Sequence, residues 1–561
     1  MSSLPQDNAV AMVQSDCIID PGPPAPPLRL PPVKEVLSNY TLLTRIFSNI
    51  IPFDDRDANR AAIAAGRKRL LAIARVCSTF RDPALDCLWK CLGSLVPLLL
   101  LIDGVSLVDG VYNIADIQAD QLGPSFFKCA ERVQTLEISE RMAIVHKDAP
   151  IDPNIYLLLS QQLGGAPLLP SLESIVLSLP TSPSSTTLPL PMILPCSSLH
   201  AVEVQGPILE TEWCHNVFLQ TLASRASNSL KRLVLKHDKT QVPFGGLWDT
   251  VLKLTALEAL SICLPESRLN PPSGSLWLLL NRLTHLSSLN LEISDLTDSA
   301  LGRLTRSPSS GPPGTSKYVS SLQHLSLLED VRASYLSGSH ASQLLVPVVV
   351  RSLTSVTLTS NRSDPWEKLE YVGDALGKCT DLRRVVLQST KPGTKVYSSA
   401  ILQFLDRVHP DEFVVNIDEL YSYGGVTPDF FGRLLDKLGV GVVQSKKQGA
   451  DRQGPQRLVH SLILPPNWGG YSIDLKSLAR IAQKAPTLRR IGIPITSDLH
   501  PTTYQHITEF VSSGPLGPES SNLLHLELCD ARDPECPGRI SPYQYQIIAQ
   551  YIDKLFPSIY I

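Results

Sequence analysis

The chain has 561 residues, 43% of them hydrophobic, and a formal net charge of −3. Its 50 basic and 53 acidic side chains give no basic excess, which argues against nucleic acid as a partner. The 11 cysteines are an odd number without a CxxC pair, and no signal peptide or membrane-length apolar run is found. We therefore expect a cytoplasmic or nuclear protein with no membrane partner.

The N-terminal part of the chain predicts a leader followed by three helices. Residues 1–34 are rich in proline and are expected to be disordered. Apolar residues at helical spacing predict a helix over 42–50, a second over 70–80 after a polar stretch, and a third over 83–92 opened by a proline. So small a helical unit buries too little surface to stand alone, so a partner or the adjoining segment should cover it.

Particular residues of these helices carry a resemblance to a known family. They are Leu43, Ile46 and Phe47, then Leu71, Ala74, Val76, Cys77 and Phe80, and finally Asp82-Pro-Ala-Leu with Leu88-Trp89. The segment 35–95 resembles the F-box, in the form found in fungal F-box-like proteins. The resemblance implies binding of a Skp-type adaptor of a cullin ligase through Leu43, Ile46, Phe47, Leu71, Val76, Cys77, Phe80, Leu88 and Trp89. The alternative is that the three helices only cap the C-terminal part of the chain and bind no partner.

Linking helices are expected over 96–129, and then one short motif recurs. It consists of an aliphatic residue, two variable residues, an aliphatic, one variable residue and an aliphatic. Copies begin at Val133, Leu172, Leu199, Leu230, Leu257, Leu286, Leu322, Leu353, Leu382, Val459, Leu488 and Leu523, with an imperfect copy around 413–417. The last two aliphatics of each copy would point to one core from a short strand, and helical stretches between copies would form an outer layer.

This pattern resembles leucine-rich repeats of the longer, ribonuclease-inhibitor-like type. The predicted fold is therefore an α/β leucine-rich-repeat solenoid over 130–535, preceded by a small three-helix F-box-like module. Loop insertions are expected near 181–191, 307–317 and 445–456, and a helical cap over 536–561. The alternative is an ordinary α/β domain with buried strands.

The variable third and fifth positions of the motif should share the concave face of the solenoid. Their arginines and glutamates are mixed with small neutral residues, which suits a protein or peptide ligand better than a phosphate backbone. The candidate target-binding residues are Arg232, His324, Arg384, Arg490 and His525. The alternative is a merely solvated face.

The chain lacks the local sequence motifs of catalysis and cofactor binding. There is no Walker A loop, GxGxxG, HExxH or GxSxG, and Cys87 with Cys91 is better explained by packing than by zinc. We therefore predict no catalytic residue, no cofactor and no metal. The leading hypothesis is the substrate-recognition subunit of a Skp-cullin-F-box type ubiquitin ligase that binds an unknown protein target. The alternatives are a repeat scaffold without a ubiquitin role and an enzyme on an irregular α/β fold.

Overall fold

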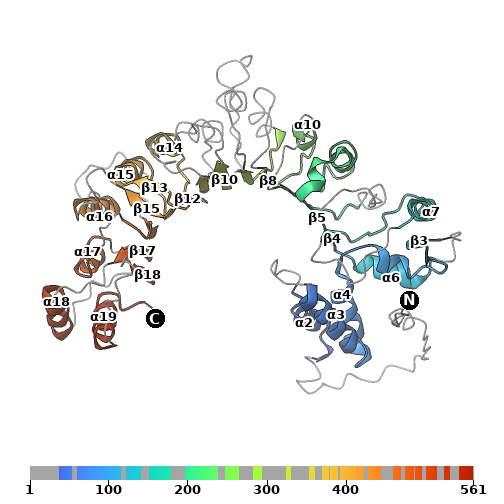
Figure 1. Ribbon diagram of the computed structural model, residues 1–561, viewed down its shortest axis with the longest axis horizontal. Helices are drawn as coiled ribbons and strands as arrows, with labels where there is room; N and C mark the ends of the chain where they lie inside the picture. The colour runs from blue at the N-terminus through green and yellow to red at the C-terminus, as the bar shows by residue number, and fades with distance from the viewer. Residues whose placement is uncertain are drawn as a thin grey trace, which may run out of the picture. The chain divides into compact units, whose positions relative to one another are not determined.

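The chain divides into two compact units, Met1–His237 with Asp249–Leu257, and Asp238–Trp248 with Glu258–Ile561 (Figure 1). The computed structural model describes residues 37–52, 60–114, 122–139, 151–178, 196–237, 247–264, 282–292, 324–329, 353–360, 369–377, 379–389, 392–421, 428–443, 459–468, 474–485, 487–495, 501–513, 523–530 and 542–559.

The first unit begins with helices and continues as a parallel sheet. Its helices are α2 (Tyr40–Ser48), α3 (Arg60–Ala74), α4 (Ser78–Trp89), α5 (Val96–Leu99), α6 (Pro124–Arg132), α7 (Pro153–Leu163), η2 (Gly206–Glu210), η3 (Trp213–Phe218), α9 (Leu219–Arg225) and, where the two units meet in sequence, α10 (Leu247–Val251). Its strands are β1 (Cys91–Leu92), β2 (Ser106–Val108), β3 (Val111–Asn113), β4 (Thr135–Ser139), β5 (Ser174–Ser178), β6 (Ala201–Gln205) and β7 (Arg232–Lys236). The sheet order is β1-β4-β5-β6-β7, and β2 and β3 form a separate antiparallel hairpin.

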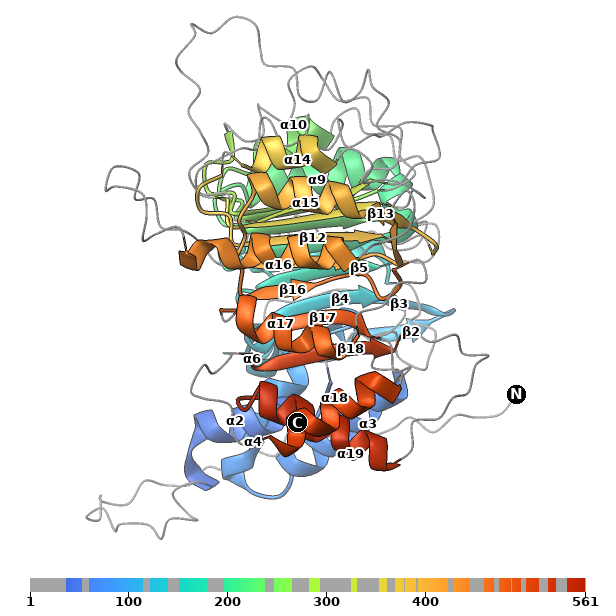
Figure 2. The same ribbon diagram turned by 90° about the vertical axis from the view of Figure 1, so that its left-hand side faces the viewer.

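The second unit is a longer parallel sheet with its own helices. The strands are β8 (Ala259–Cys263), β9 (Ser288–Glu292), β10 (His324–Glu329), β11 (Ser355–Ser360), β12 (Arg384–Ser389), β13 (Lys395–Tyr397), β14 (Glu412–Asn416), β15 (Glu419–Tyr421), β16 (Ser461–Ile463), β17 (Arg490–Ile495) and β18 (His525–Asp530). The helices are α14 (Leu369–Leu376), α15 (Ser398–Arg407), α16 (Pro428–Val443), α17 (Lys476–Lys484), α18 (Pro501–Ser512) and α19 (Pro542–Leu555). The sheet order is β8-β9-β10-β11-β12-β14-β16-β17-β18, and β13 and β15 form a separate pair. Figure 2 shows β12, β16, β17 and β18 following one another in this order.

The strand pairing confirms the predicted repeat. Each strand of the motif pairs in parallel with its neighbour, and third position aligns with third position, as in Ala201 with Arg232 and Arg490 with His525. The fourth and sixth positions face the core, since Leu233 and Leu235 are fully buried while Arg232 is exposed. The architecture is therefore a mixed α/β array of parallel strands, as expected.

One hydrogen-bond arrangement recurs at the start of these strands. The carbonyl of the residue before a strand accepts two consecutive amides from the next repeat: Gln134 O accepts from Glu173 and Ser174, at 2.7 and 3.0 Å. The same pair of bonds is made to Glu173, His200, Glu258, Thr354, Asp411, His460 and Arg489. Because each repeat satisfies the amides of the next, the backbone reinforces the stacking that buries the aliphatic side chains.

One strand of the array was predicted with a shifted start, and another was not predicted from the sequence. β14 aligns Glu412 with Arg384, so its motif starts at Pro410, and the imperfect copy lies a few residues earlier than the predicted 413–417. β1 aligns Cys91 with Thr135, and Lys90 O accepts the amides of Gln134 and Thr135 in the recurring arrangement. The segment assigned to the helical module therefore already contains the first strand of the sheet.

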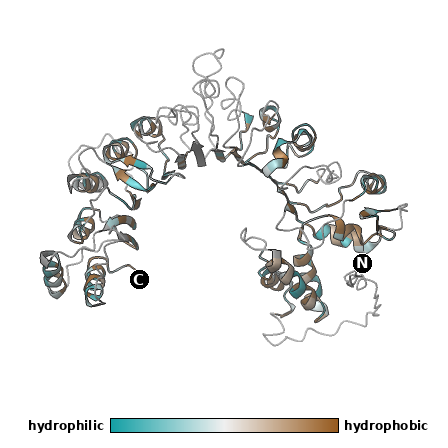
Figure 3. Cartoon of the chain, viewed as in Figure 1, coloured by the Kyte–Doolittle hydropathy of each residue, from teal (hydrophilic) through white to brown (hydrophobic). Residues whose placement is uncertain are grey.

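The helices of the second unit lie on one side of its strands. Figure 1 shows α14, α15 and α16 in a layer beside the strands, and Figure 3 shows that these helices carry both apolar and polar faces. Phe404 of α15 stacks on Phe413 of β14, with ring centroids 5.3 Å apart. Such contacts make the helical layer the second half of each repeat's core, as the amphipathic pattern predicts.

The helices of the N-terminal module differ from the predicted bounds. α3 begins at Arg60, ten residues before the expected start, because the alanine-rich segment 61–65 favours a helix and buries Ile63. α4 begins at Ser78, so Pro83 lies inside the helix rather than in its first turn. The expected linking helices over 96–129 include α5 and part of α6, together with the β2–β3 hairpin.

Several sequence predictions fall on other parts of the chain. The leader over 1–34 and the insertions near 181–191, 307–317 and 445–456 lie outside the described residues. In the segment predicted as a helical cap, the structure places α19. Among the described helices, none combines the length and the apolar character that crossing a membrane requires.

Candidate functional site

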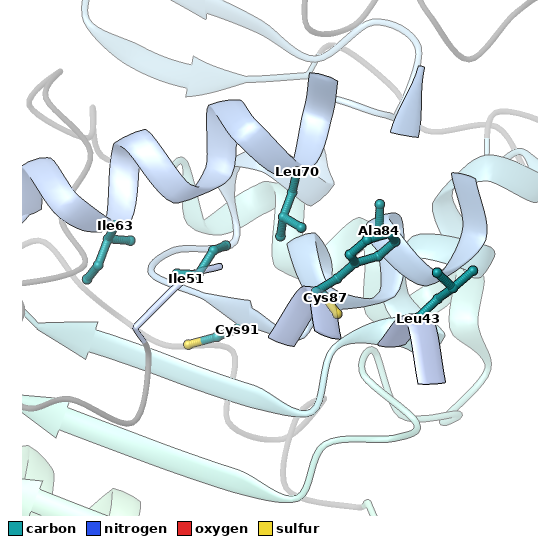
Figure 4. Packing of buried hydrophobic residues seen from close by; sticks show 8 residues of the cluster. Leu43, Ile51, Ile63, Leu70, Ala84, Cys87 and Cys91 are labelled. Atoms are coloured by element: carbon teal, nitrogen blue, oxygen red, sulfur yellow. The ribbon is translucent and has the colours of Figure 1, made fainter. Parts of the chain in front are cut away.

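The three helices of the module share a small core. Leu43 and Phe47 of α2 pack with Ile51, Ile63, Leu70, Ala84, Cys87 and Cys91, all buried (Figure 4). Phe47 meets Phe80 edge to face at a centroid distance of 5.6 Å. Two of the predicted adaptor-binding residues, Leu43 and Phe47, therefore stabilise the module itself, and Phe80 and Leu88 are partly buried against the same core.

A second set of apolar residues of the module lies outside this core. Leu42 and Ile46 are 36% and 49% exposed and stand one turn apart on α2. Leu71 of α3 is 37% exposed, and Val76 in the turn before α4 is 67% exposed. We call these four residues the outer apolar surface. Of the predicted adaptor-binding residues, Ile46, Leu71 and Val76 belong to it, Cys77 is exposed beside Val76, and Trp89 is partly buried.

The part of the outer apolar surface that lies on and after α3 has positively charged neighbours in the sequence. Helix α3 contains Arg60, Arg67, Lys68 and Arg69 and no acidic residue. Lys68, Arg69 and the following Arg75 are exposed. A partner that covered Leu71 and Val76 would therefore meet basic side chains beside them, which suits an acidic partner surface.

Polar contacts fasten the module to the first repeats. Arg132 of α6 bonds Asp82 with Nη2 at 2.9 Å and Asp86 with Nε at 3.2 Å, both on α4. The Tyr40 hydroxyl of α2 donates to Asp86 as well. Burial raises the pKa of Asp86, and the Arg132 charge opposes that rise. These contacts join α2, α4 and α6.

A partly buried arginine makes a second connection. Arg67 of α3 donates from Nη2 to the carbonyl of Cys91 in β1, at 3.2 Å. Burial lowers the pKa of Arg67, while the charges of Cys91 and Glu137 act in the opposite sense. Nearby, burial raises the pKa of Cys87 to about 11, Asp86 adds to the rise and Lys90 opposes it, so this thiol stays neutral at physiological pH. Cys87 and Cys91 thus act in packing, as expected.

Truncation of the Arg132 side chain should measurably weaken the contact between α4 and α6. Arg132→Ala removes two charge-assisted bonds between α4 and α6, with Arg132 19% and Asp86 29% exposed. We expect the contact between α4 and α6 to lose about 1 kcal/mol of stability, a small value because both side chains are partly exposed to solvent. Hydrogen exchange of α4 and α6 in the full chain would show it. The control is Arg81→Ala, since Arg81 is exposed on α4; equal exchange in the two variants would contradict the assignment.

The predicted target-binding residues lie on the strands as expected, but in both units. Arg232 is exposed on β7 of the first unit. Arg384, Arg490 and His525 are exposed on β12, β17 and β18 of the second unit. His324 begins β10, where its backbone aligns with that of Ser355.

In the second unit these residues form a row with neighbouring polar residues, of which Glu412 was not predicted from the sequence. Arg384 Nε bonds Glu412 at 3.0 Å, and Arg490 Nη2 lies 3.7 Å from Glu527. Ser461 lies between them, and its buried hydroxyl has no hydrogen-bond partner within the described part of the chain. The row therefore consists of two charged pairs with one small polar residue between them. Glu412 was missed because Pro410 stands in the first position of its motif, where an aliphatic was required.

The described residues hold no group of three or more His, Cys, Asp or Glu side chains placed to bind a metal ion. What they offer chemically is contact: an apolar surface with a basic margin on the helices, and a row of paired charges on the strands. Both are features of protein interaction surfaces.

Comparison with known proteins does not identify a family for this chain. No protein-family model matches the chain, and no curated protein is similar to it. Among solved structures, the chain is similar to a crystal structure of TLR13 in complex with ssRNA13, with 13% identity, 79% of this chain covered and a TM-score of 0.35. The match covers 54% of the TLR13 chain, so this chain spans about half of its length.

Proposed function

We propose that this chain is the substrate-recognition subunit of a Skp-cullin-F-box type ubiquitin ligase. In this proposal the outer apolar surface of α2 and α3 binds the Skp-type adaptor, and the strand face of the leucine-rich-repeat array binds a protein target. The chain itself would contribute no catalytic residue, since partner enzymes would perform the transfer and this chain would supply proximity.

One observation carries the proposal: the module satisfies its own core and still exposes large apolar side chains. With Leu43 and Phe47 buried inside, Ile46 and Val76 remain 49% and 67% exposed. Burial of such a side chain against a partner contributes up to about 1.5–3 kcal/mol to the free energy of binding. The resemblance of these same helices to the F-box supplies the identity of the partner.

A second candidate is a repeat scaffold whose module is only a cap. It is favoured by the contacts that fasten the module to the first repeats, namely Arg132 with Asp82 and Asp86, and Arg67 with the Cys91 carbonyl. A cap requires these contacts but no exposed docking residues. The two candidates therefore differ at Ile46 and its neighbours and can be separated there.

The test is recovery of the adaptor by the full-length chain. Ile46→Asp places a charge in the outer apolar surface, and we expect it to weaken adaptor binding on the order of 10- to 100-fold. The matched control is Leu157→Asp on α7, where Leu157 is 59% exposed and lies outside the module. It should bind like the wild-type chain, and both variants should keep the wild-type circular dichroism.

Two results would count against the ligase proposal. If the wild-type chain recovers no adaptor where known F-box proteins do, the scaffold candidate stands. If the adaptor binds Ile46→Asp as tightly as the wild-type chain, docking does not use this surface.

A further inference from the structure

Among the described strands, none pairs with the outer edge of β18, the last strand of the second unit. β18 pairs with β17 on one side and ends the sheet order. The His525 amide donates to Arg489 O at 2.9 Å, so it points toward the β17 side. Backbone groups alternate along a strand, and those of Leu526 and Leu528 therefore point away from β17. No backbone hydrogen bond joins these groups to another residue that the structure describes.

The side chains of β18 also lack the cover that other strands have. On β17, Ile491 and Ile493 are 0% and 1% exposed, whereas Leu526 and Leu528 at the same motif positions are only half-buried. Leu524, just before the strand, is 49% exposed. Helix α19 follows β18 in the chain, but it packs on α17 and α18. Leu526 and Leu528 are therefore less covered than the matching residues of β17 within the described part of the chain.

Three of the common protections of an edge strand are absent from β18. Exposed edge strands commonly carry lysine, proline or a bulge that prevents pairing with another chain. β18 has the sequence HLELCD, without lysine or proline, and pairs with β17 in an unbroken register. Such an edge is suited to accept a further strand.

The residues of β18 are complementary to a second copy of themselves. In an antiparallel pair centred on Leu526, His525 of one copy lies opposite Glu527 of the other, and Leu524 lies opposite Leu528. The Leu526 groups that point outward would exchange hydrogen bonds across the centre, and the His525–Glu527 pairs would fall at the positions where side chains approach most closely. A shift that centred the pair on Glu527 would oppose two carboxylates. The Glu527 carboxylate already lies 3.7 Å from Arg490 and can accept from both groups.

We propose that β18 is the interface of a homodimer, in which two copies of the chain join edge to edge through antiparallel pairing centred on Leu526. A two-fold axis through that pair makes the contact self-complementary and closes the assembly at two chains. This dimer is independent of the ligase proposal, because it uses no residue of the helical module.

The first test is the oligomeric state of the full-length chain by sedimentation velocity, from about 1 to about 100 µM, a range suited to small interfaces. We expect the wild-type chain to dimerise and His525→Glu, which opposes carboxylates in both pairs, to raise the dissociation constant about tenfold or more. The exchange His525→Glu with Glu527→His keeps each pair complementary and should restore the dimer. Circular dichroism of the three proteins should be alike.

The second test fixes the register. In a hydrogen-bonded antiparallel pair the Cα atoms lie about 5.5 Å apart, within reach of a disulfide. Leu526→Cys should therefore cross-link two chains under oxidation. Leu524→Cys should not, because in this register the two 524 positions lie about 13 Å apart.

Three results would overturn the proposal. The first is a wild-type chain that stays monomeric throughout the range. The second is a dimer whose dissociation constant is unchanged by His525→Glu and whose Leu526→Cys variant forms no cross-link. The third is a monomer that captures an extended peptide at this edge, which would assign β18 to another partner.

Discussion

Replacing Phe47 with aspartate is expected to unfold the three-helix module. Phe47 is 6% exposed and meets Phe80 edge to face, in a core that includes Leu43 and Leu70. Loss of a buried phenylalanine costs about 3–5 kcal/mol, and the buried carboxylate adds its desolvation. A module this small has little stability to lose. Hydrogen exchange of α2, α3 and α4 in the full chain should rise to that of an unfolded segment.

The neighbouring residue supplies the control. Ile46 is on the same turn but 49% exposed, so Ile46→Asp should keep the protection of all three helices. Wild-type protection in Phe47→Asp would show that the core assignment is wrong. The comparison also matters for function, since loss of adaptor binding in Phe47→Asp would report unfolding, whereas loss in Ile46→Asp would report a lost contact.

Replacing Trp468 with alanine is expected to destabilise the second unit by about 3–5 kcal/mol. Trp468 is fully buried, and its Nε1 donates to Pro465 O at 2.9 Å. Its ring lies 5.7 Å from Phe430 and 6.3 Å from Phe431, both on α16. One side chain therefore holds α16 against the segment that leaves β16. Urea unfolding followed by circular dichroism, with hydrogen exchange at α16, would measure the loss.

Trp468→Phe separates the two contributions. It keeps an aromatic ring beside Phe430 and Phe431 but leaves the Pro465 carbonyl without its donor, so we expect a smaller loss, on the order of 1–2 kcal/mol. If Trp468→Ala unfolds within about 1 kcal/mol of the wild-type chain, the ring does not carry the packing described.

The sequence predicted the repeat because its signal is local and repeated. Aliphatics at the fourth and sixth positions, such as Leu233 and Leu235, must face one core whenever the strand forms. β1 was not predicted, and β14 was predicted only as an imperfect copy with a shifted start, because Trp89 and Pro410 stand where an aliphatic was required. The residue at the first position of the motif only fills space in the turn. Residue types other than aliphatics are therefore tolerated there, and a pattern that requires an aliphatic misses them.

The site was less predictable than the fold. Leu42 and Ile46 are as apolar as Leu43 and Phe47, so a linear pattern cannot tell which pair enters the core. Only the packing of α3 and α4 on α2 decides it. The pairing of Arg384 with Glu412 was hidden for another reason, because it depends on a strand whose register the motif did not reveal.

In the ligase proposed above, the connection between α4 and β1 would set the position of a bound target relative to the adaptor. A single residue, Lys90, separates the end of the helix at Trp89 from the strand at Cys91, and its carbonyl bonds to the next repeat. A connection of one hydrogen-bonded residue leaves α4 and β1 little freedom to rotate relative to each other. A target bound to β4 to β7 would therefore be held in a fixed orientation relative to the adaptor. The lysines modified would then be those at the right distance along the target's surface, and lengthening the joint at Lys90 should redirect the modification to others.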